Sequence, residues 1–509
     1  MTSTQSSQEV LADHDTVGGD NTSNKAKSTN IFLRLIQYHY RVTKYEKSEE
    51  QVLRESKLLP CIPFNRWFLI PAAVIIQFCC GSLYAWSVFN QPIDVLIYGE
   101  VVNMAPITFY IAVGSFGLSA ATFGPWLERN GPMVSCLLGT TLFVVGNYIT
   151  ALALYLRLIW LVFVGYGITS GVGLGICYIS PVSALQKWFP DKRGMASGLA
   201  VCGFGAGSII FAKVQLPLYN NVGLPLTFVV LGSVYLVLMV LSGLVLRTPP
   251  PNFSVGSDQT ENGKVVEAHA NGDPPDKISL IDALTSNNYR FMYAMLLANS
   301  IFGLVVISRL ANMTKEIFGK TPDEGATVVS INGLFNLGGR LCFSILSDYI
   351  GRKNCFIIML TSQLIILGSF STITTTQTYW AFLMTMFIIS SCYGAGFGVI
   401  PAFLSDTFGA TNIGSAHGLI LTAWSLAGVC GGLTFTAVFN AYRDGAHPSD
   451  PHPYNINVWW IFGVVFLGWI ALLFVTPTAK DRAFTRRPRS FFRSIINRIT
   501  NRERSFEMN

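Results

Sequence analysis

Residues 341–360 read LCFSILSDYIGRKNCFIIML, and the arrangement of this stretch decides the fold. Its centre, residues 348–353, holds one acidic side chain, two basic side chains and a glycine. Apolar runs extend on both sides of this centre, over about 326–347 and 355–375. A helix needs roughly 20 apolar residues to cross a bilayer core about 30 Å thick. The stretch therefore predicts two membrane-spanning helices joined by a short charged turn.

Runs of this length and character recur along the chain. A helix satisfies its own backbone hydrogen bonds, which lipid cannot do, so a helix is the expected form of each run. The sequence thus predicts about twelve transmembrane helices. The runs lie near 67–88, 106–127, 133–155, 159–184, 195–216, 226–246, 291–312, 326–347, 355–375, 379–404, 415–440 and 457–476.

The composition excludes several classes of protein. Of the 509 residues, 51% are hydrophobic and only 12% are charged, and the mean hydropathy is +0.44. Soluble proteins carry roughly 25% charged residues, so the chain lacks the polar surface of a soluble enzyme or a nucleic-acid-binding protein. The ten cysteines lack the paired spacing of a zinc module or a disulfide scaffold. We expect an integral, multi-pass membrane protein with no metal, no cofactor and no nucleic-acid partner.

The basic residues predict how the chain is oriented. Lys and Arg total 35, of which 28 fall in the two tails, the central linker or the loops on that side, while four fall on the other side and three inside spans. Because cytoplasmic segments carry an excess of Lys and Arg, both termini and the linker are expected in the cytoplasm, with the cell membrane as the default location. The predicted parts are a cytoplasmic N-terminal tail (1–64), a six-helix bundle (65–246), a cytoplasmic linker (247–290), a second six-helix bundle (291–476) and a basic cytoplasmic C-terminal tail (477–509).

The two halves of the chain match at one constant offset of 220 residues. Parallel six-span repeats are a known transporter architecture, in which substrate binds near the midplane between the halves and is exposed to each side alternately. The sequence therefore predicts an all-α membrane protein whose twelve transmembrane helices form two pseudo-symmetric six-helix bundles. The matched pairs are Glu128 and Asp348, Gly131 and Gly351, Pro181 and Pro401, Gly194 and Gly414, Ala196 and Ala416, and Gly198 and Gly418.

Four motifs carry a family resemblance. Residues 347–353 (SDYIGRK) resemble the loop signature of the major facilitator superfamily. Residues 187–198 (KWFPDKRGMASG), 65–67 (NRW) and 84–89 (YAWSVF) together resemble the oxalate/formate antiporter family and the related monocarboxylate transporters. The resemblance covers about residues 64–476. It implies the twelve-helix fold of the superfamily and the transport of small organic anions.

The loop signature also has a physical interpretation. Asp348, at the end of a helix, can pair with a basic residue or accept hydrogen bonds at the N-terminus of a neighbouring helix, and Gly351 permits a tight turn. By resemblance to the superfamily, such contacts stabilise one state of the transport cycle without touching substrate. The alternative is a set of solvated charges that only fixes membrane topology. The residues expected in this conformational gate are Asp348, Gly351, Arg352, Glu128, Gly131 and Arg193.

One cation lies where the bilayer disfavours it. Arg340 is expected roughly 10–12 Å inside the membrane, about eight residues from the span's end at 1.5 Å each, where a charge costs at least roughly 2.5–3.5 kcal/mol. Asn336 lies one helical turn away on the same face, and Asn332 a further turn. A guanidinium beside amides suits a carboxylate, which accepts two parallel hydrogen bonds.

We predict that Arg340 binds substrate, and it matches the substrate-binding arginine that the family resemblance implies in this span. The alternative is a structural arginine paired with an acid, for which the spans offer almost no candidate. Tyr178, Trp86 and Trp424 are candidates for the cavity wall, although membrane aromatics more often pack in the core or at the interfaces.

Two further polar residues lie inside predicted spans. Arg309, near the end of its span, either lines the substrate path or extends to the surface. His417 is the candidate for proton coupling, and a packing role is the more frequent alternative for a buried histidine.

The eleventh span separates possible substrates. Oxalate-specific members of the resembling family are expected to carry a lysine there, and residues 414–440 hold neither lysine nor arginine. A dicarboxylate facing a single cation would bury an uncompensated charge. The sequence thus favours a monocarboxylate of the formate, lactate, pyruvate or acetate class, moved by anion exchange or by symport with protons. The alternatives are another organic anion, such as oxalate or another dicarboxylate, and a non-transporting membrane sensor with the same fold.

An enzyme is not expected, because the spans hold no nucleophile–base pair and no metal cluster. The C-terminal tail instead predicts a lipid contact. Its apolar residues Phe492, Ile495, Ile496 and Ile499 recur at helical spacing among arginines. A basic amphipathic helix of this kind binds an anionic inner leaflet of the bilayer, and a disordered basic tail is the alternative.

Overall fold

The computed structural model describes residues 38–41, 47–59, 62–100, 102, 104–250, 253, 280–443 and 450–485. The residues from Tyr40 onward form one compact unit, and the helices below belong to it. The predicted amphipathic segment of the C-terminal tail lies outside the described residues.

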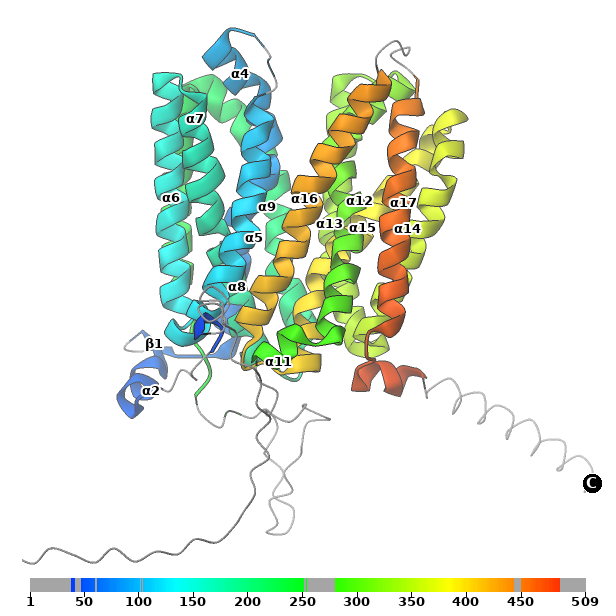
Figure 1. Ribbon diagram of the computed structural model, residues 1–509. Coiled ribbons are helices and arrows are strands. Elements are labelled where there is room, and N and C mark those ends of the chain that lie inside the picture. The colour runs from blue at the N-terminus through cyan, green and yellow to red at the C-terminus, as the bar shows by residue number, and fades with distance from the viewer. Residues whose placement is uncertain are drawn as a thin grey trace, which may run out of the picture. The chain divides into compact units, whose positions relative to one another are not determined.

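The first bundle contains six spans of the described chain (Figure 1). The first span, Arg66–Tyr98, is longer than predicted because a tightly wound 3-10 segment and a further helix continue it. Asp94 in that extension accepts a hydrogen bond from the Ala105 amide, 2.9 Å away, at the start of the next span. The elements are η1 (Arg66–Phe68), α3 (Leu69–Cys80), η2 (Gly81–Phe89), α4 (Asn90–Tyr98), α5 (Ala105–Asn130), α6 (Pro132–Leu156), α7 (Ile159–Val162), η3 (Phe163–Ser170), α8 (Gly171–Trp188), α9 (Arg193–Val222) and α10 (Leu224–Gly243).

The second bundle follows the same plan. Among the described residues, eleven helices are long and apolar enough to cross a membrane, and α12, bent by 51° between Val305 and Arg309, makes a twelfth. The predicted twelve-span fold is therefore confirmed. The elements are α12 (Asn287–Phe318), α13 (Pro322–Ile350), α14 (Arg352–Thr375), α15 (Tyr379–Phe408), α16 (Ile413–Arg443) and α17 (His452–Phe474).

The structure shows shorter elements outside the spans. Before the first span lie α2 (Glu49–Glu55) and an antiparallel pair of strands, β1 (Lys57–Leu59) and β2 (Ile62–Pro63). The predicted linker, residues 247–290, contains α11 (Leu280–Thr285) and the first turn of α12. That turn begins before the apolar run because the Ser286 hydroxyl accepts a hydrogen bond from the Tyr289 amide at 3.2 Å, which caps the helix.

The turns between spans lie at two opposite ends of the helices (Figure 1). The linker end holds the end of α10, the start of α12 and the α5–α6, α8–α9, α13–α14 and α15–α16 turns. The distal end holds the remaining turns between spans. Arg129, Arg193 and Arg352, which the sequence predicts on one side of the membrane, all lie at the linker end.

The backbone repeats with the same offset as the sequence. Gly131 between α5 and α6 has a φ of 84°, and Gly351 between α13 and α14 has a φ of 99°. At the far ends of the following helices, Arg157 and Gln377 also have positive φ values, 57° and 51°. Positive φ is uncommon outside glycine, so its recurrence at equivalent non-glycine positions indicates duplicated helix pairs.

The two halves meet along α5 with α16 and along α9 with α13. Close contact between α5 and α16 requires glycine: a Cβ added at Gly418 would lie 2.0 Å from the Ala120 carbonyl oxygen, and one at Gly124 would lie 2.8 Å from the Gly414 carbonyl oxygen. Small residues of this kind let membrane helices approach closely. The site described next lies where the halves meet.

Candidate functional site

A small cavity lies between the two halves. Four aromatic residues of the first half and Arg340 with two aromatic residues of the second half form its wall. Only about 10 Å³ of it can hold the centre of a water molecule, which is close to the minimum for one water. The cavity must therefore widen to admit even a small organic molecule. The wall consists of Tyr84, Phe116, Tyr178, Phe204, Arg340, Phe397 and Trp424.

Arg340 is the charged residue of this wall, and its side chain is only 1% exposed. Its Nε donates to the Asn336 amide oxygen at 3.0 Å, and its Nη1 donates to the Val201 carbonyl oxygen at 3.3 Å. Its Nη2 has no hydrogen-bond partner among the described residues. The guanidinium also lies 5.4 Å and 5.1 Å from the ring centroids of Phe204 and Phe397. Among the described residues no carboxylate pairs with it, so one donor group stays unused in a buried cation.

The position of Arg340 depends on close contact between α13 and α15. A Cβ added at Gly339 would lie 2.0 Å from the Ser391 carbonyl oxygen, and one at Gly394 would lie 2.2 Å from the Asn336 carbonyl oxygen. A Cβ at Gly398 would lie 2.4 Å from the carbonyl oxygen of Arg340 itself. These glycines therefore let the backbones of the two helices meet beside the guanidinium.

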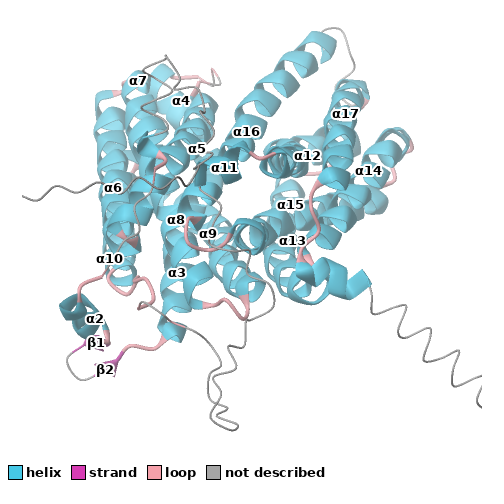
Figure 2. Ribbon diagram, turned by 60° about the horizontal axis from the view of Figure 1, so that its bottom comes forward, coloured by secondary structure: helices cyan, strands magenta, loops and turns pink. Residues whose placement is uncertain are grey.

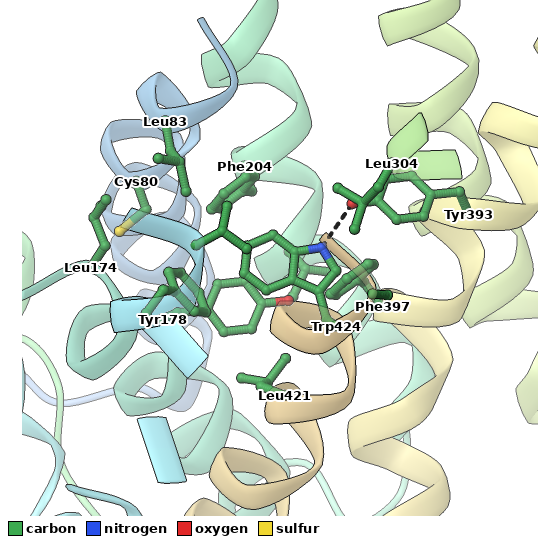
Figure 3. Packing of buried hydrophobic residues seen from close by; sticks show 14 of the residues in the cluster. Cys80, Leu83, Leu174, Tyr178, Phe204, Leu304, Tyr393, Phe397, Leu421 and Trp424 are labelled. Atoms are coloured by element: carbon green, nitrogen blue, oxygen red, sulfur yellow. Dashed lines mark hydrogen bonds between the residues drawn. The ribbon is translucent and has the colours of Figure 1, made fainter. Parts of the chain in front are cut away.

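Hydrogen bonds between hydroxyl and indole groups link aromatic residues at the cavity. The Tyr84 and Tyr393 hydroxyls, from the first and second halves, lie 2.6 Å apart. The Trp424 indole nitrogen donates to the Tyr393 hydroxyl at 2.9 Å, the contact drawn in Figure 3. Figure 3 also shows Tyr178, Phe204 and Phe397 gathered around the Trp424 ring. One hydrogen bond, between Tyr84 and Tyr393, thus joins the two halves at the cavity, and the Trp424 indole extends it within the second half.

Replacing Tyr84 with phenylalanine is expected to lower apparent substrate affinity by about three- to tenfold with little loss of stability. The change removes one hydrogen bond between the halves, and such bonds within membranes contribute roughly 0.6–2 kcal/mol. Substrate concentration series of the uptake rate measure the effect. Tyr148→Phe is the control, because that hydroxyl bonds Ser233 inside the first bundle. Equal affinities for the wild type and Tyr84→Phe would contradict a role for the hydroxyl pair in closing the cavity.

The structure brings some of the predicted binding residues together and not others. Arg340, Tyr178 and Trp424 line the cavity. Asn336 supports Arg340, because its amide oxygen accepts from Arg340, and its amide nitrogen donates to the Ser390 carbonyl at 3.2 Å. Its contribution to substrate binding stays a prediction.

Asn332 and Trp86, also predicted to bind substrate, are not among the residues that line the cavity. Asn332 is 3% exposed, and its amide oxygen has no partner among the described residues. Trp86 packs inside the first bundle, where its ring stacks on Tyr166 with centroids 4.2 Å apart and its indole nitrogen donates to the Ala105 carbonyl at 3.2 Å. Tyr84, two positions earlier in the same 3-10 segment, lies on a different face and lines the cavity instead.

Arg309 and His417 also lie outside the cavity wall. The Arg309 Nη2 donates to the Thr436 hydroxyl at 2.8 Å, beside the Phe435 ring, 5.4 Å from its centroid. His417 is 1% exposed, and neither ring nitrogen has a hydrogen-bond partner among the described residues. Its ring centroid lies 5.8 Å from that of Tyr178, which is part of the wall. His417 is therefore separated from the cavity by one side chain.

The predicted gate residues of the second half contact the first half at the linker end. Asp348 accepts hydrogen bonds from the Gly194 amide at 3.2 Å and the Met195 amide at 2.9 Å, at the N-terminus of α9. It also pairs with Arg352 at 2.7 Å and with Lys480 at 3.1 Å. The side chain is placed where a helix N-terminus favours negative charge. Asp348 therefore makes both contacts expected from the loop signature: it pairs with a basic residue, and it caps the N-terminus of a neighbouring helix.

The first half makes the mirror contact. Glu128 accepts a hydrogen bond from the Gly414 amide at 2.6 Å, at the N-terminus of α16, and another from the Ser183 hydroxyl at 3.2 Å. It also pairs with Lys187. Each half therefore contributes one carboxylate that caps a helix of the other half, at equivalent positions of the repeat.

A buried arginine joins this arrangement. Arg352 is fully buried, and its Nε donates to Asp406 at 2.9 Å in addition to its pair with Asp348. Arg193 reaches the same Asp406 carboxylate from the first half at 3.1 Å. Asp406 thus joins the contacts of the predicted gate residues, although the sequence patterns do not identify it. We call Glu128, Asp348, Asp406, Arg193 and Arg352 the linker-end gate.

Five aromatic residues at or beside the cavity are absent from the predicted binding residues: Tyr84, Phe116, Phe204, Tyr393 and Phe397. Phe204 and Phe397 each lie between two glycines, in Gly203–Gly205 and Gly396–Gly398. A large ring flanked by glycines in a membrane helix is the signal that could have identified these two, since the flanking helices must approach closely around it.

Comparison with known proteins establishes the family. The family model for the Major Facilitator Superfamily matches residues 77–432. The chain belongs to the major facilitator superfamily. It is thus an integral, multi-pass membrane protein of a transporter family.

Curated members of the superfamily resemble this chain at low identity. The uncharacterized MFS-type transporter YhjX of Escherichia coli is 26% identical over 366 residues, which cover 72% of this chain and 86% of that protein. The oxalate:formate antiporter of Oxalobacter formigenes is 24% identical over 374 residues, covering 72% and 84%. Mouse monocarboxylate transporter 12 is 24% identical over 311 residues, covering 57% and 61%. The resemblance to these families is therefore confirmed.

A solved structure shares the fold. The crystal structure of a bacterial homologue of the iron transporter ferroportin, in an outward-facing state, aligns with a TM-score of 0.58 at 15% identity. The alignment covers 80% of this chain and 98% of that one. At this identity the match establishes the arrangement of helices and nothing about the substrate.

Proposed function

We propose that the protein is a secondary active transporter of small monocarboxylates that works by alternating access. The observation that carries the proposal is Arg340: a buried guanidinium on the wall of a cavity between the halves, with one nitrogen unpartnered and no carboxylate of the described chain beside it. A buried cation without a counter-ion is costly. A substrate carboxylate would supply both the missing charge and the missing acceptor.

The rest of the wall favours one carboxylate over two. Besides Arg340, all the lining residues are aromatic, and residues 414–440 add no second cation. The Tyr178 hydroxyl, which has no hydrogen-bond partner in the described part of the chain, can bond a keto or hydroxyl oxygen. This chemistry suits a small monocarboxylate with an apolar or weakly polar body. Transport of oxalate by one relative and of monocarboxylates by others agrees with an organic anion as the substrate class.

The proposed transporter could move its substrate in exchange for another anion or together with protons, and the proposal includes both mechanisms. His417 supports symport, because it is a titratable side chain buried one residue away from the cavity with both nitrogens unpartnered. The excess of basic residues at the linker end supports a cytoplasmic position for that end and for both termini.

Uptake into proteoliposomes tests the proposal. We expect labelled formate, acetate, lactate or pyruvate to enter at least about tenfold faster than oxalate at equal concentration, because a second carboxylate would be buried without a cation. Imposing a pH gradient separates symport, which the gradient accelerates, from exchange, which requires counter-substrate inside. Oxalate uptake as fast as the best monocarboxylate would overturn the substrate class. Binding of an anion without any uptake would favour the sensor alternative.

A further inference from the structure

A second cavity lies at the linker end, outside the substrate site. Its volume is about 520 Å³, within the usual range for ligand pockets. Three parts of the chain enclose it: α2 with β1, the α5–α6 turn with the first turn of α6, and the residues that follow α10. Figure 2 shows α2 and the two strands beside the ends of α10 and α3.

Arg247 fixes the outer wall of this cavity. Its Nη1 donates to the carbonyl oxygens of Glu55 at 2.6 Å and of Lys57 at 3.2 Å. Its guanidinium lies 4.2 Å from the Phe64 ring centroid. Nearby, the Lys47 ammonium donates to the Thr248 carbonyl at 2.5 Å and pairs with the Glu55 carboxylate. The segment before the first span is therefore held against the end of α10, and the cavity is preformed.

The cavity is basic. Arg54, Lys57 and Arg247 line it together with a single acid, Glu55, whose charge is already matched by Lys47. In the part of the chain that the structure describes, no carboxylate forms an ion pair with any of the three cations. Burial lowers the pKa of Arg247, which means that its charged form lacks full solvation. An anion in the cavity would compensate that loss.

The cavity also has polar and apolar sides. Gln51, Asn130 and Thr248 are the uncharged polar residues of the lining. The Gln51 amide oxygen accepts from the Ser48 amide and the Asn130 amide nitrogen donates to the Trp126 carbonyl. The Gln51 amide nitrogen, the Asn130 amide oxygen and the Thr248 hydroxyl are groups that suit a polyol phosphate. Val134 lines the cavity on α6 and is 45% exposed, and Leu244 near the end of α10 is 48% exposed. Exposed apolar side chains on membrane spans face lipid. The cavity thus opens where acyl chains meet headgroups.

We propose that this cavity binds the phosphorylated inositol headgroup of an anionic phospholipid, with the acyl chains lying along α6 and α10. The cations take the phosphates, and the amides and hydroxyl take the ring hydroxyls. A free inositol phosphate has the same headgroup chemistry but would gain nothing from the exposed apolar side chains at the rim. The inference requires that the spans lie in a bilayer and is independent of what the central cavity transports.

Native mass spectrometry of the purified full chain in detergent tests the site. Dioctanoyl phosphatidylinositol 4-phosphate is expected to bind at least about tenfold more tightly than dioctanoyl phosphatidylcholine and than soluble inositol 1,4-bisphosphate. Arg54→Gln/Lys57→Gln, which changes two exposed side chains and so leaves the fold intact, is expected to weaken binding at least about tenfold, because each basic residue near a membrane surface contributes several-fold. Lys192→Gln/Arg290→Gln is the matched control, with the same loss of charge at the same end but outside the cavity.

Three results would overturn the site. If the control variant weakened lipid binding as much, the effect would come from the general surface charge and not from this cavity. Equal affinity for phosphatidylcholine would remove the role of the cations. Binding of soluble inositol 1,4-bisphosphate as tight as that of the lipid would assign the cavity to a soluble ligand. These lipid affinities do not depend on transport activity. The proposed lipid site can therefore be wrong while the proposed transport function is right, and the reverse.

Discussion

Replacing Arg340 with glutamine is expected to reduce monocarboxylate uptake at least about 100-fold. The substrate carboxylate would enter a cavity walled by aromatic rings with no cation to neutralise it. Breaking a buried charge pair by removing one partner costs roughly 3–5 kcal/mol, and about 1.4 kcal/mol corresponds to a factor of ten in affinity. Initial uptake rates into proteoliposomes at substrate concentrations below the wild-type KM measure the change.

Arg340→Lys keeps the positive charge and is expected to lose most of the activity as well. A lysine cannot donate to Asn336 and Val201 while also directing two parallel hydrogen bonds at a carboxylate. Lys213→Gln is the matched control, because it removes an exposed cation from within the α9 span, outside the cavity wall. Uptake near the wild-type rate in both Arg340 variants would remove the anion site from the proposal.

Thermal stability distinguishes a binding arginine from a structural one. Without substrate, Arg340→Gln removes a buried charge that has no carboxylate partner in the described chain, so its Tm is expected to equal or exceed that of the wild type. Added monocarboxylate is expected to raise the Tm of the wild type, by preferential binding to the folded state, and not that of the variant. A variant Tm several degrees below the wild type without substrate would instead assign Arg340 a structural role.

Patterns that depend on local sequence predicted the fold well. Run length and the 220-residue repeat predict twelve spans in two bundles, and the backbone confirms the repeat down to matched positive φ values at Arg157 and Gln377. Boundaries were less predictable. α12 begins earlier than the apolar run because a serine cap, not hydrophobicity, starts it, and η2 and α4 lengthen the first span.

In the candidate site, the sequence identifies a residue only where its chemistry is unusual for its position. A lone arginine inside a span is visible in sequence, and helical spacing correctly places Asn336 beside it. The use of the Asn336 amide by Ser390 of another helix is a tertiary contact that spacing cannot reveal. The choice between Tyr84 and Trp86 depends on how the 3-10 segment is turned about its axis, because side chains two positions apart in such a helix lie on different faces.

Neutralising both carboxylates that cap the opposite halves, in Asp348→Asn/Glu128→Gln, is expected to open the linker-end gate and to shift the conformational equilibrium at least about tenfold. Each carboxylate accepts backbone hydrogen bonds at the N-terminus of a helix in the other half. Such charge-assisted contacts contribute roughly 1.5–3 kcal/mol each, and the favourable interaction with the helix N-terminus disappears with the charge. Opening at this end would raise amide hydrogen exchange at the starts of α9 and α16.

The single variants decide whether the two caps form one gate. If the halves separate as bodies, Asp348→Asn raises exchange at the N-terminus of α16 as well as α9, and Glu128→Gln raises both as well. A local loss of capping would raise exchange only at the helix that each carboxylate contacts. Hydrogen–deuterium exchange followed by mass spectrometry resolves the two helices in separate peptides. Glu324→Gln is the control, because Glu324 forms the capping box of α13 with Thr321 inside its own half.

The buried Arg352 explains why the gate is expected to act as a unit. Its guanidinium contacts Asp348 and Asp406, while Arg193 of the other half contacts Asp406. Loss of the Asp348 charge leaves Arg352 with one carboxylate, which it must share with Arg193. The charge balance across the boundary therefore changes even where no hydrogen bond is removed. Exchange confined to α9 in Asp348→Asn would show that this sharing does not couple the halves, and the gate would then be two independent caps.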